Sequence, residues 1–395
     1  MTVRRESSTP RPDWSATVRS QGLVYADTEL PDGRFMSYWD ESACYRMELD
    51  EVLRLEEATE ELHRMSVAAA EHVVAKNRFA EFGIPAWAAE AVSRSLREQP
   101  PTLYGRFDLW YDGSWPPKML EYNADTPTAL VEASVIQWYW LEDTRPTLDQ
   151  WNSVHERLVE AWRKIGAGLH DPLVHVAWSD EEETGEDQMT AGYLAETAYQ
   201  AGLRTEMLPM LEIGWDGRRF TAPAGPDGAR TPILTCFKLY PWEWMLAEPY
   251  GRPALDPGTP TTWIEPAWKL LLSNKALLAV LWELYPDHPF LLPAYLDSPR
   301  GMAEYVVKPL LGREGGSVRI VTGAGEINNP GIYGDEGWCY QEFRALPSFS
   351  DNHVVLGSWV VDGESAGAGI RESKSLITDG YARFLPHYVD APREP

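Results

Sequence analysis

RFDLWYDG at Arg106–Gly113 and LEYNADT at Leu120–Thr126 are the two stretches of sequence from which the fold can be read. In each stretch polar and apolar residues alternate, which predicts two short β-strands, and the Asp-Gly pair between them predicts a turn. Residues two apart on a strand point to the same face, so polar groups are expected together on one side of the paired strands. Those residues are Arg106 and Asp108 in the first strand and Glu121 and Asn123 in the second.

Two carboxylates, an amide oxygen and a guanidinium on one surface suit magnesium–phosphate chemistry. Mg²⁺ prefers oxygen ligands and commonly binds through one or two carboxylates together with substrate phosphates. The Arg106 side chain can bind phosphoryl oxygens in a bidentate manner. Asp108, Glu121 and Asn123 are therefore candidate magnesium ligands. The alternative is a structural Arg–Asp pair on the strands, followed by an Asn-Ala-Asp turn.

Two lysines further along the chain are candidates for phosphate binding. YVVKPLLGREGGSV at Tyr305–Val318 predicts a strand that ends near Lys308 and enters a glycine-rich turn, whose backbone N–H groups could lie over a phosphate chain. The pattern GxxxxGK[ST] is missing, so this is not a Walker A loop. Lys275 lies in a polar interruption, Ser-Asn-Lys, of an apolar helical stretch, where a charge has to face either a cleft or solvent.

Two further segments place charge where a ligand could lie. Arg371 follows a run of small residues, and we expect it on a mobile loop from which it could reach an anionic centre. In KLYPWEW at Lys238–Trp244, Glu243 lies between two tryptophans, where a carboxylate and aromatic faces could hold a cation. Aromatic packing is the alternative there, because the chain contains 18 Trp.

The arrangement of the other segments predicts an α+β protein. Residues 1–40 are rich in Pro, Ser, Asp and Gly and are expected to form an irregular arm. Apolar residues at helical spacing predict long helices over Cys44–Phe82 and Trp151–Leu169. Residues 173–211 have the pattern strand, helix, strand, typical of a βαβ unit. The region beyond residue 305 is rich in strands, which favours α+β layers over a doubly wound sheet.

Composition excludes several classes of protein. The chain has 395 residues, of which 44% are hydrophobic and 24% charged, and its net charge is −25. These values are typical of a globular protein, and such an acidic surface repels nucleic acids and anionic membranes. The three cysteines are widely spaced, which favours reduced thiols over a disulfide framework. With no apolar leader or spanning segment in the sequence, we expect a cytoplasmic location.

Taken together, these motifs resemble the glutathionylspermidine synthase family, specifically its synthetase part, which has an ATP-grasp ligase fold. The resemblance runs in order over nearly the whole chain after about residue 35. Besides the stretches already quoted, it is carried by EPAWKLLLSNKALLAVLWELYPDHPFLLPAY at Glu265–Tyr295, CYQEF at Cys339–Phe343 and GSWVVDGESAGAGIRES at Gly357–Ser373. The amidase domain that some members carry before the synthetase is missing from the sequence, so amide hydrolysis by that route is not expected.

The resemblance implies an enzyme that uses ATP and Mg²⁺ to activate a carboxylate as an acyl phosphate and join it to an amine. A small peptide such as glutathione and a polyamine such as spermidine are the candidate substrates. Residues 41–395 would form the synthetase region, with 41–170 and 262–395 as the ATP/Mg core and 171–261 as a βαβ-containing subdomain on the substrate side.

The same resemblance implies a role for individual residues. Magnesium would be bound by Asp108, Glu121 and Asn123, and catalysis would involve Arg106 and Arg371. ATP would contact Arg106, Lys275, Lys308, Gly315, Gln341 and Glu342. The substrates would contact Asp125, Thr126 and Glu243. Two rival functions stay open at this point. One is an ATP-binding scaffold or sensor that has the same fold without turnover, and the other is a kinase that phosphorylates a small molecule.

Overall fold

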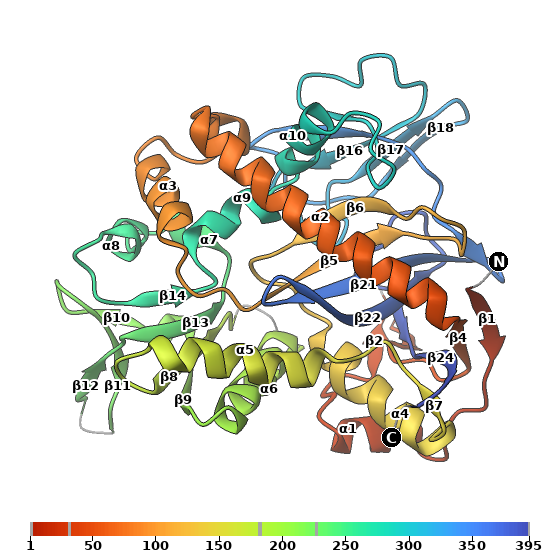
Figure 1. Ribbon diagram of the computed structural model, residues 1–395, viewed down its shortest axis with the longest axis horizontal. Coiled ribbons are helices and arrows are strands. Elements are labelled where there is room, and N and C mark those ends of the chain that lie inside the picture. Colours follow the sequence, from red (N-terminus) through yellow and green to blue (C-terminus); the bar gives the residue numbers. More distant parts are fainter. Residues whose placement is uncertain (1–2, 31–32, 181–183, 226–227, 394–395) are drawn as a thin grey trace.

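The computed structural model describes residues 3–30, 33–180, 184–225 and 228–393 of the chain. Its centre is a six-stranded antiparallel sheet in the order β23-β22-β21-β5-β6, with β20 beside β21 (Figure 1). These strands are β5 (Tyr104–Trp110), β6 (Lys118–Asn123), β20 (Ser348–Phe349), β21 (Asn352–Val361), β22 (Glu364–Ser373) and β23 (Arg383–Leu385). The predicted strand pair, β5 and β6, is therefore present at one edge of the sheet.

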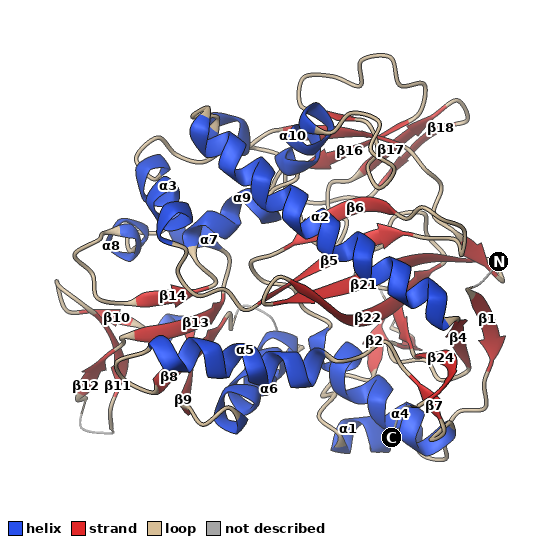
Figure 2. Ribbon diagram, viewed as in Figure 1, coloured by secondary structure: helices blue, strands red, loops and turns tan. Residues whose placement is uncertain are grey.

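Helices cover both faces of this sheet (Figure 2). The long helix α2 (Leu49–Ala75) lies on one face, where its buried leucines share a core with Phe107 and Leu109 of β5. The other face is covered by α5 (Val154–Gly168) and by the π-helical turn η2 (Glu132–Ile136), which continues as α4 (Gln137–Thr144). Because apolar residues of β5 face α2, the polar residues that alternate with them face away from it.

The N-terminal segment differs from the irregular arm that the sequence predicts. It contains β1 (Arg4–Ser7), α1 (Trp14–Ser20), β2 (Asp27–Glu29) and β3 (Phe35–Ser37). The predicted helix over Cys44–Phe82 is also too long, since its first residues form a strand and its last ones a separate turn. That strand, β4 (Ala43–Met47), pairs with β1 on one side and with β24 (His387–Pro392) on the other, so its backbone groups are satisfied by neighbouring strands.

The expected βαβ unit is confirmed. β8 (Leu173–Trp178), α6 (Glu186–Gln200) and β9 (Arg204–Pro209) form it, and the two strands are parallel. They belong to a sheet in the order β14-β13-β8-β9, completed by β13 (Thr235–Leu239) and β14 (Thr262–Ile264). A small sheet of β10 (Gly214–Trp215), β11 (Phe220–Pro223) and β12 (Arg230–Pro232) extends from its end (Figure 1).

A third layer carries the glycine-rich turn. Its five strands have the order β15-β19-β16-β17-β18, and they are β15 (Ala294–Tyr295), β16 (Tyr305–Pro309), β17 (Arg319–Thr322), β18 (Gly325–Asn328) and β19 (Trp338–Glu342). The apolar helical stretch around Lys275 consists of η4 (Ala267–Lys269), α9 (Leu270–Ser273) and α10 (Ala276–Leu284). Asn274 has extended backbone angles, so the polar interruption does break the helix.

The remaining short elements connect these layers. They are η1 (Phe79–Phe82), α3 (Ala89–Glu98), β7 (Leu148–Asp149), η3 (Met210–Glu212), α7 (Trp242–Ala247) and α8 (Gly251–Leu255). All three cysteines are buried and free. In the described part of the chain, no helix combines the length and apolar character needed to cross a bilayer.

Candidate active site

The polar residues of β5 and β6 lie together at the wall of one large cavity. In the register of the two strands, Asp108 is opposite Glu121 and Arg106 is opposite Asn123, as the alternation predicts. All four line a cavity of about 940 Å³ between the central sheet and the layer that carries the glycine-rich turn. The wall facing this space is thus polar, whereas the opposite face of β5 packs against α2.

Asp108 is held between two arginines. Arg106 Nε donates to its Oδ1 at 2.8 Å, and Arg371 Nη2 donates to its Oδ2 at 2.6 Å. Burial alone would raise the pKa of Asp108, but the two guanidinium groups outweigh burial and lower the pKa to about 2. The carboxylate is therefore ionised at any physiological pH. Arg106 also donates to the carbonyl oxygen of Thr128 at 2.5 Å, which fixes its orientation.

Glu121 contacts one of the two predicted lysines and is influenced by the charge of the other. Lys275 Nζ lies 3.3 Å from Glu121 Oε2. Burial disfavours the ionised form of Glu121, but Lys275 and Lys308 keep the pKa of this carboxyl below its usual value, although Asp108 opposes them. Lys308 Nζ donates to Gln341 Oε1 and to the carbonyl oxygen of Leu120, both at 2.8 Å. Burial lowers the pKa of Lys308, while the charge of Glu121 acts in the opposite direction.

The glycine-rich turn forms another wall of the cavity. Gly315 has a left-handed backbone with φ of 66°, and a Cβ atom there would lie 2.6 Å from the carbonyl oxygen of Thr378, so only glycine suits the position. Its carbonyl oxygen accepts a hydrogen bond from Asn329 Nδ2 at 2.9 Å. From the same turn, Arg313 Nη2 donates to Thr126 Oγ1 at 2.8 Å. The turn is thereby tied to the loop that follows β6.

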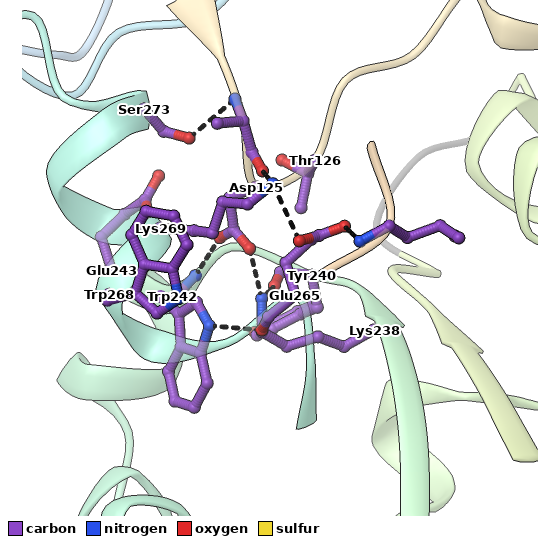
Figure 3. Close-up of polar contacts among 12 residues, drawn as sticks. Asp125, Thr126, Lys238, Tyr240, Trp242, Glu243, Glu265, Trp268, Lys269 and Ser273 are labelled. Carbon is purple, nitrogen blue, oxygen red and sulfur yellow. Dashed lines mark hydrogen bonds and ion pairs between the residues drawn. The ribbon is translucent and has the colours of Figure 1, made fainter. Parts of the chain in front are cut away.

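A buried ion pair supports the loop that follows β6, which also lines the cavity. Lys238 Nζ donates to Asp125 Oδ1 at 2.6 Å, and the other carboxylate oxygen accepts the backbone N–H of Trp242 at 2.9 Å (Figure 3). Both side chains are almost fully buried, so each charge needs the other. Glu243 follows Trp242 and lines the cavity, and burial raises the pKa of its carboxyl. Arg313 lies 3.9 Å from Glu243.

A second buried pair joins the strand pair to the helical segment behind it. Lys269 Nζ donates to the carbonyl oxygens of Tyr104 and Ala124 at 3.0 and 3.1 Å, and lies 2.9 Å from Glu265 Oε2. Glu265 Oε1 accepts the backbone N–H groups of Leu103 and Tyr104. These contacts hold the start of β5 and the end of β6 to one support, parts of which appear in Figure 3.

The structure brings nearly all the predicted site residues into one place. The predicted site residues that line the shared cavity are Arg106, Asp108, Glu121, Asn123, Asp125, Thr126, Glu243, Lys308, Gly315, Gln341, Glu342 and Arg371. Lys275 is not at the cavity surface but contacts Glu121 directly. One expectation is wrong: Arg371 lies in β22, paired with β21 and β23, and not on a mobile loop. The run of small residues before it is buried within the sheet, where there is no room for larger side chains.

Sequence reasoning gave no role to two cations that help to shape the site. Lys238 lies within the apolar strand TCFKL, and a lysine in such a strand signals a buried partner, which is Asp125. Arg313 follows the first glycine of the glycine-rich turn and reaches Thr126. No sequence signal identifies that partner, because the contact depends on how two layers of the fold lie against each other.

The side chains of Asp108, Glu121 and Asn123 offer the oxygen ligands that a magnesium ion prefers. Among the described residues, no group of three or more His, Cys, Asp or Glu side chains is arranged as a metal site. Asp108 and Glu121 nevertheless face each other across the strand pair as ionised carboxylates, with Asn123 Nδ2 at 3.2 Å from Glu121 Oε1. Two carboxylates and an amide suit a hard cation that takes its other ligands from water and phosphate.

The sequence of the chain is similar to a described protein family and to several known ligases. The family described as "Glutathionylspermidine synthase preATP-grasp" matches residues 5–390. A Haemophilus influenzae protein named as an acid–amine ligase is 37% identical, and the match covers 96% of this chain and 97% of that protein. Trypanothione synthetase of Crithidia fasciculata is 31% identical over 75% of this chain and 49% of its own length. The bifunctional glutathionylspermidine synthetase/amidase of Escherichia coli is 26% identical over 81% and 55%.

A solved structure has a similar fold at low sequence identity. The glutathione synthetase-like effector of Globodera pallida, in its apo form, superposes with a TM-score of 0.53 at 8% identity, and the match covers 94% of both chains. At this identity the likeness concerns the fold alone. The chain spans only about half the length of the trypanothione synthetase and of the bifunctional enzyme.

Proposed function

The chain belongs to the glutathionylspermidine synthase family of amide-forming ligases, and on this premise we propose that it uses ATP and Mg²⁺ to activate a carboxylate as an acyl phosphate and transfers the acyl group to an amine. The core would have the ATP-grasp fold. The observation that carries the proposal is the shared cavity, in which the carboxylates of β5 and β6 meet Lys308, more than 150 residues further along the chain, while Lys275 contacts Glu121 from behind the lining.

The cations would bind the phosphates of ATP. Lys275 contacts Glu121, and the charge of Lys308 also acts on this carboxylate. Arg106 and Arg371 both contact Asp108. The glycine-rich turn with Gly315 would cover the phosphates, with Gln341 and Glu342 nearer the adenine. In the transfer of a γ-phosphoryl group, catalysis is mainly positioning and electrostatic stabilisation, so preorganised cations around the site are what the reaction needs.

Asp108, Glu121 and Asn123 would hold the magnesium ion. When bound, Mg²⁺ neutralises charge on the phosphate oxygens. Arg371 contacts one oxygen of Asp108 through one guanidinium nitrogen, so it can also stabilise an oxyanion that forms when the amine attacks. Arg106 is fixed by two partners and would orient the transferred phosphoryl group.

The substrate groups would lie at the other end of the cavity. Glu243 and the loop with Asp125 and Thr126 line the same cavity. A carboxylate such as Glu243 suits a cationic amine, for which a polyamine such as spermidine is the candidate. A small peptide such as glutathione is the candidate for the carboxylate.

Release of ADP tests the proposal. The purified chain is incubated with ATP, Mg²⁺ and a matrix of small peptides and amines, and ADP is measured together with the mass of the product. We expect ADP only where a matching carboxylate and amine are both present, with one amide formed per ADP. A stable phosphorylated product that needs no amine would show a kinase instead, and tight ATP binding without turnover across the panel would show a nucleotide-binding protein.

A further inference from the structure

The guanidinium of Arg313 lies against three groups of the kind that bind organic cations. Its Nη2 donates to Thr126 Oγ1 at 2.8 Å and lies 3.9 Å from Glu243 Oε1. Its Cζ lies over the indole of Trp244, 5.0 Å from the ring centroid. A hydrogen-bond acceptor, a carboxylate and an aromatic face are thus directed at one positive charge. All four residues line the active-site cavity.

The three groups belong to segments that do not depend on Arg313 for their position. Thr126 follows Asp125, and the buried ion pair of that residue holds the loop. Glu243 and Trp244 lie in α7. The Trp244 ring packs against the ring of Tyr240 at an angle of 78°, with the centroids 5.4 Å apart. The site is therefore expected to keep its shape when the arginine leaves it.

The carboxyl of Glu243 favours a positive charge at this position. Burial raises its pKa, and Arg313 is the strongest of the charges that act in the opposite direction. Lys238 also lowers this pKa, but its Nζ is held by Asp125 at 2.6 Å. Arg313 is thus the cation that supports the ionised form of Glu243 most directly.

The arginine is held loosely enough to be replaced. Its side chain is 36% exposed, and the distance of 3.9 Å to Glu243 is too long for a hydrogen bond. Within the described part of the chain, its guanidinium makes a single hydrogen bond, to Thr126. Ion pairs with this degree of exposure contribute little to stability, so another cation can take the place of Arg313 at low cost. A free ligand is not attached to the glycine-rich turn and can approach the carboxylate more closely.

We propose that Arg313 occupies the amine-binding site of the ligase and that the amine substrate binds by displacing it. The inference rests on the proposed function. An ammonium group of the substrate would donate to Thr126 and Glu243 and lie over Trp244, where the guanidinium now lies. A protonated nitrogen cannot act as a nucleophile, so this group anchors the substrate while a second nitrogen reacts. Diamines and polyamines therefore suit the site better than monoamines, and an uncharged molecule cannot displace the arginine.

Calorimetric titration of the full chain with n-propylguanidine tests the displacement, because this probe is the arginine side chain from Cβ outward. In Arg313→Ala the site is vacant. We expect the probe to bind this variant at least roughly tenfold more tightly than the parent chain, which corresponds to a parent site that is open about one-tenth of the time. Equal affinities for the variant and the parent, or no binding to the variant, would overturn the proposal.

The matched control is Arg319→Ala. It removes the same charge from an arginine that also lies 3.9 Å from a glutamate, but that does not line the cavity. The probe should bind this variant and the parent chain equally. A similar gain in both variants would mean that the loss of any positive charge strengthens binding to this acidic protein, and would refute a site filled by Arg313.

Further variants in the Arg313→Ala background locate the bound probe. Glu243→Gln and Trp244→Leu should each weaken binding several-fold, whereas Glu326→Gln, on the exposed strand β18, should leave it unchanged. If Trp244→Leu does not fold, as judged by circular dichroism, Glu243→Gln decides. An affinity that Glu243→Gln does not change would place the probe elsewhere and refute the site.

A second titration series with spermidine tests the assignment of this site to the amine substrate. We expect the same gain in Arg313→Ala as for propylguanidine. A gain for propylguanidine alone would show a site for guanidinium compounds and would overturn the assignment to the amine. None of these titrations requires ATP or turnover, so the displacement can be confirmed while the ADP assay fails, and the reverse.

Discussion

Asp108 is the residue on which the proposed chemistry depends most, since it contacts both arginines and faces the second carboxylate. Asp108→Asn keeps the size of the side chain but removes the charge that a magnesium ion and both guanidinium groups need. We expect ADP formation to fall by roughly 10²–10³-fold with the fold retained, measured by the ADP assay and circular dichroism. Glu326→Gln, on an exposed strand, is the control. Full activity in Asp108→Asn would contradict the assigned role.

The low pKa of Asp108 yields a prediction about Arg371. Because the folded pKa, about 2, lies below the usual value of 3.8, this carboxylate contributes stability above pH 3.8 that is lost as the pH falls towards 2. In Arg371→Gln one of the two positive charges that lower this pKa is gone, so the folded pKa of Asp108 should rise. The stability lost below pH 3.8 should then be smaller, and the loss should be complete at a higher pH. Carbon-13 NMR of the carboxyl groups measures the pKa directly. Arg319→Gln, on β17, should leave it unchanged.

His63 predicts a pH dependence of stability near neutrality. Its Nδ1 lies 2.9 Å from the Tyr122 hydroxyl, and burial, together with the charge of Lys269, lowers its pKa to about 4. The unfolded chain binds a proton near pH 6.5, so this histidine contributes stability above pH 6.5 that is lost as the pH falls towards 4. The free energy of unfolding, measured with urea at pH 7 and at pH 5, should decrease less between these pH values in His63→Gln than in the exposed control His170→Gln. Equal losses would refute the effect.

At the scale of elements, the position of Arg106 depends on the neighbouring strand. Gly357 of β21 lies beside it, and a Cβ atom there would come within 3.0 Å of Arg106 Cδ and 3.3 Å of the carbonyl oxygen of Gly369. Gly357→Ala should displace the guanidinium and lower turnover by about tenfold or more, because small misplacements at a reacting centre are costly. Gly168→Ala, where the added atom meets nothing within 4 Å, should be as active as the parent. Steady-state kinetics compares the two.

Local pattern was enough to predict the strand pair and the βαβ unit. Alternation in β5 and β6 identified which residues share a face, since that depends on the strand alone. The predicted start of the helix at Cys44 was wrong, because Ala43–Met47 forms a strand that pairs with β1 and β24, which are distant in sequence. The prediction that Arg371 lies on a loop failed for the same reason. A run of small residues is typical of a flexible segment, and local sequence does not show that β21 and β23 pair with this one on both sides.

At the scale of the whole molecule, the site exists only where separate layers meet. The central sheet provides the acids, the broken helix provides Lys275, and the layer of β16 and β19 provides Lys308 and Gln341. Contacts between these layers, such as that of Arg313 with Thr126, join segments 187 residues apart. No local sequence pattern encodes such distances, so the sequence predicted most of the residues that lie together at the cavity but not how they are held.

The net charge of −25 acts on every ligand that approaches the molecule. An acidic surface attracts a cationic amine and repels an anionic carboxylate, and salt weakens both effects because the screening length falls to about 10 Å at 0.1 M. With a substrate pair identified by the ADP assay, raising the salt from about 0.05 M to about 0.5 M should therefore raise the KM for the amine and leave that for the carboxylate unchanged or lower it. Initial rates at both concentrations measure the two constants, with potassium acetate in place of chloride as the control for a specific anion effect. If the KM for the amine falls and the KM for the carboxylate rises instead, the cations lining the active-site cavity, and not the acidic surface, govern the encounter with substrate.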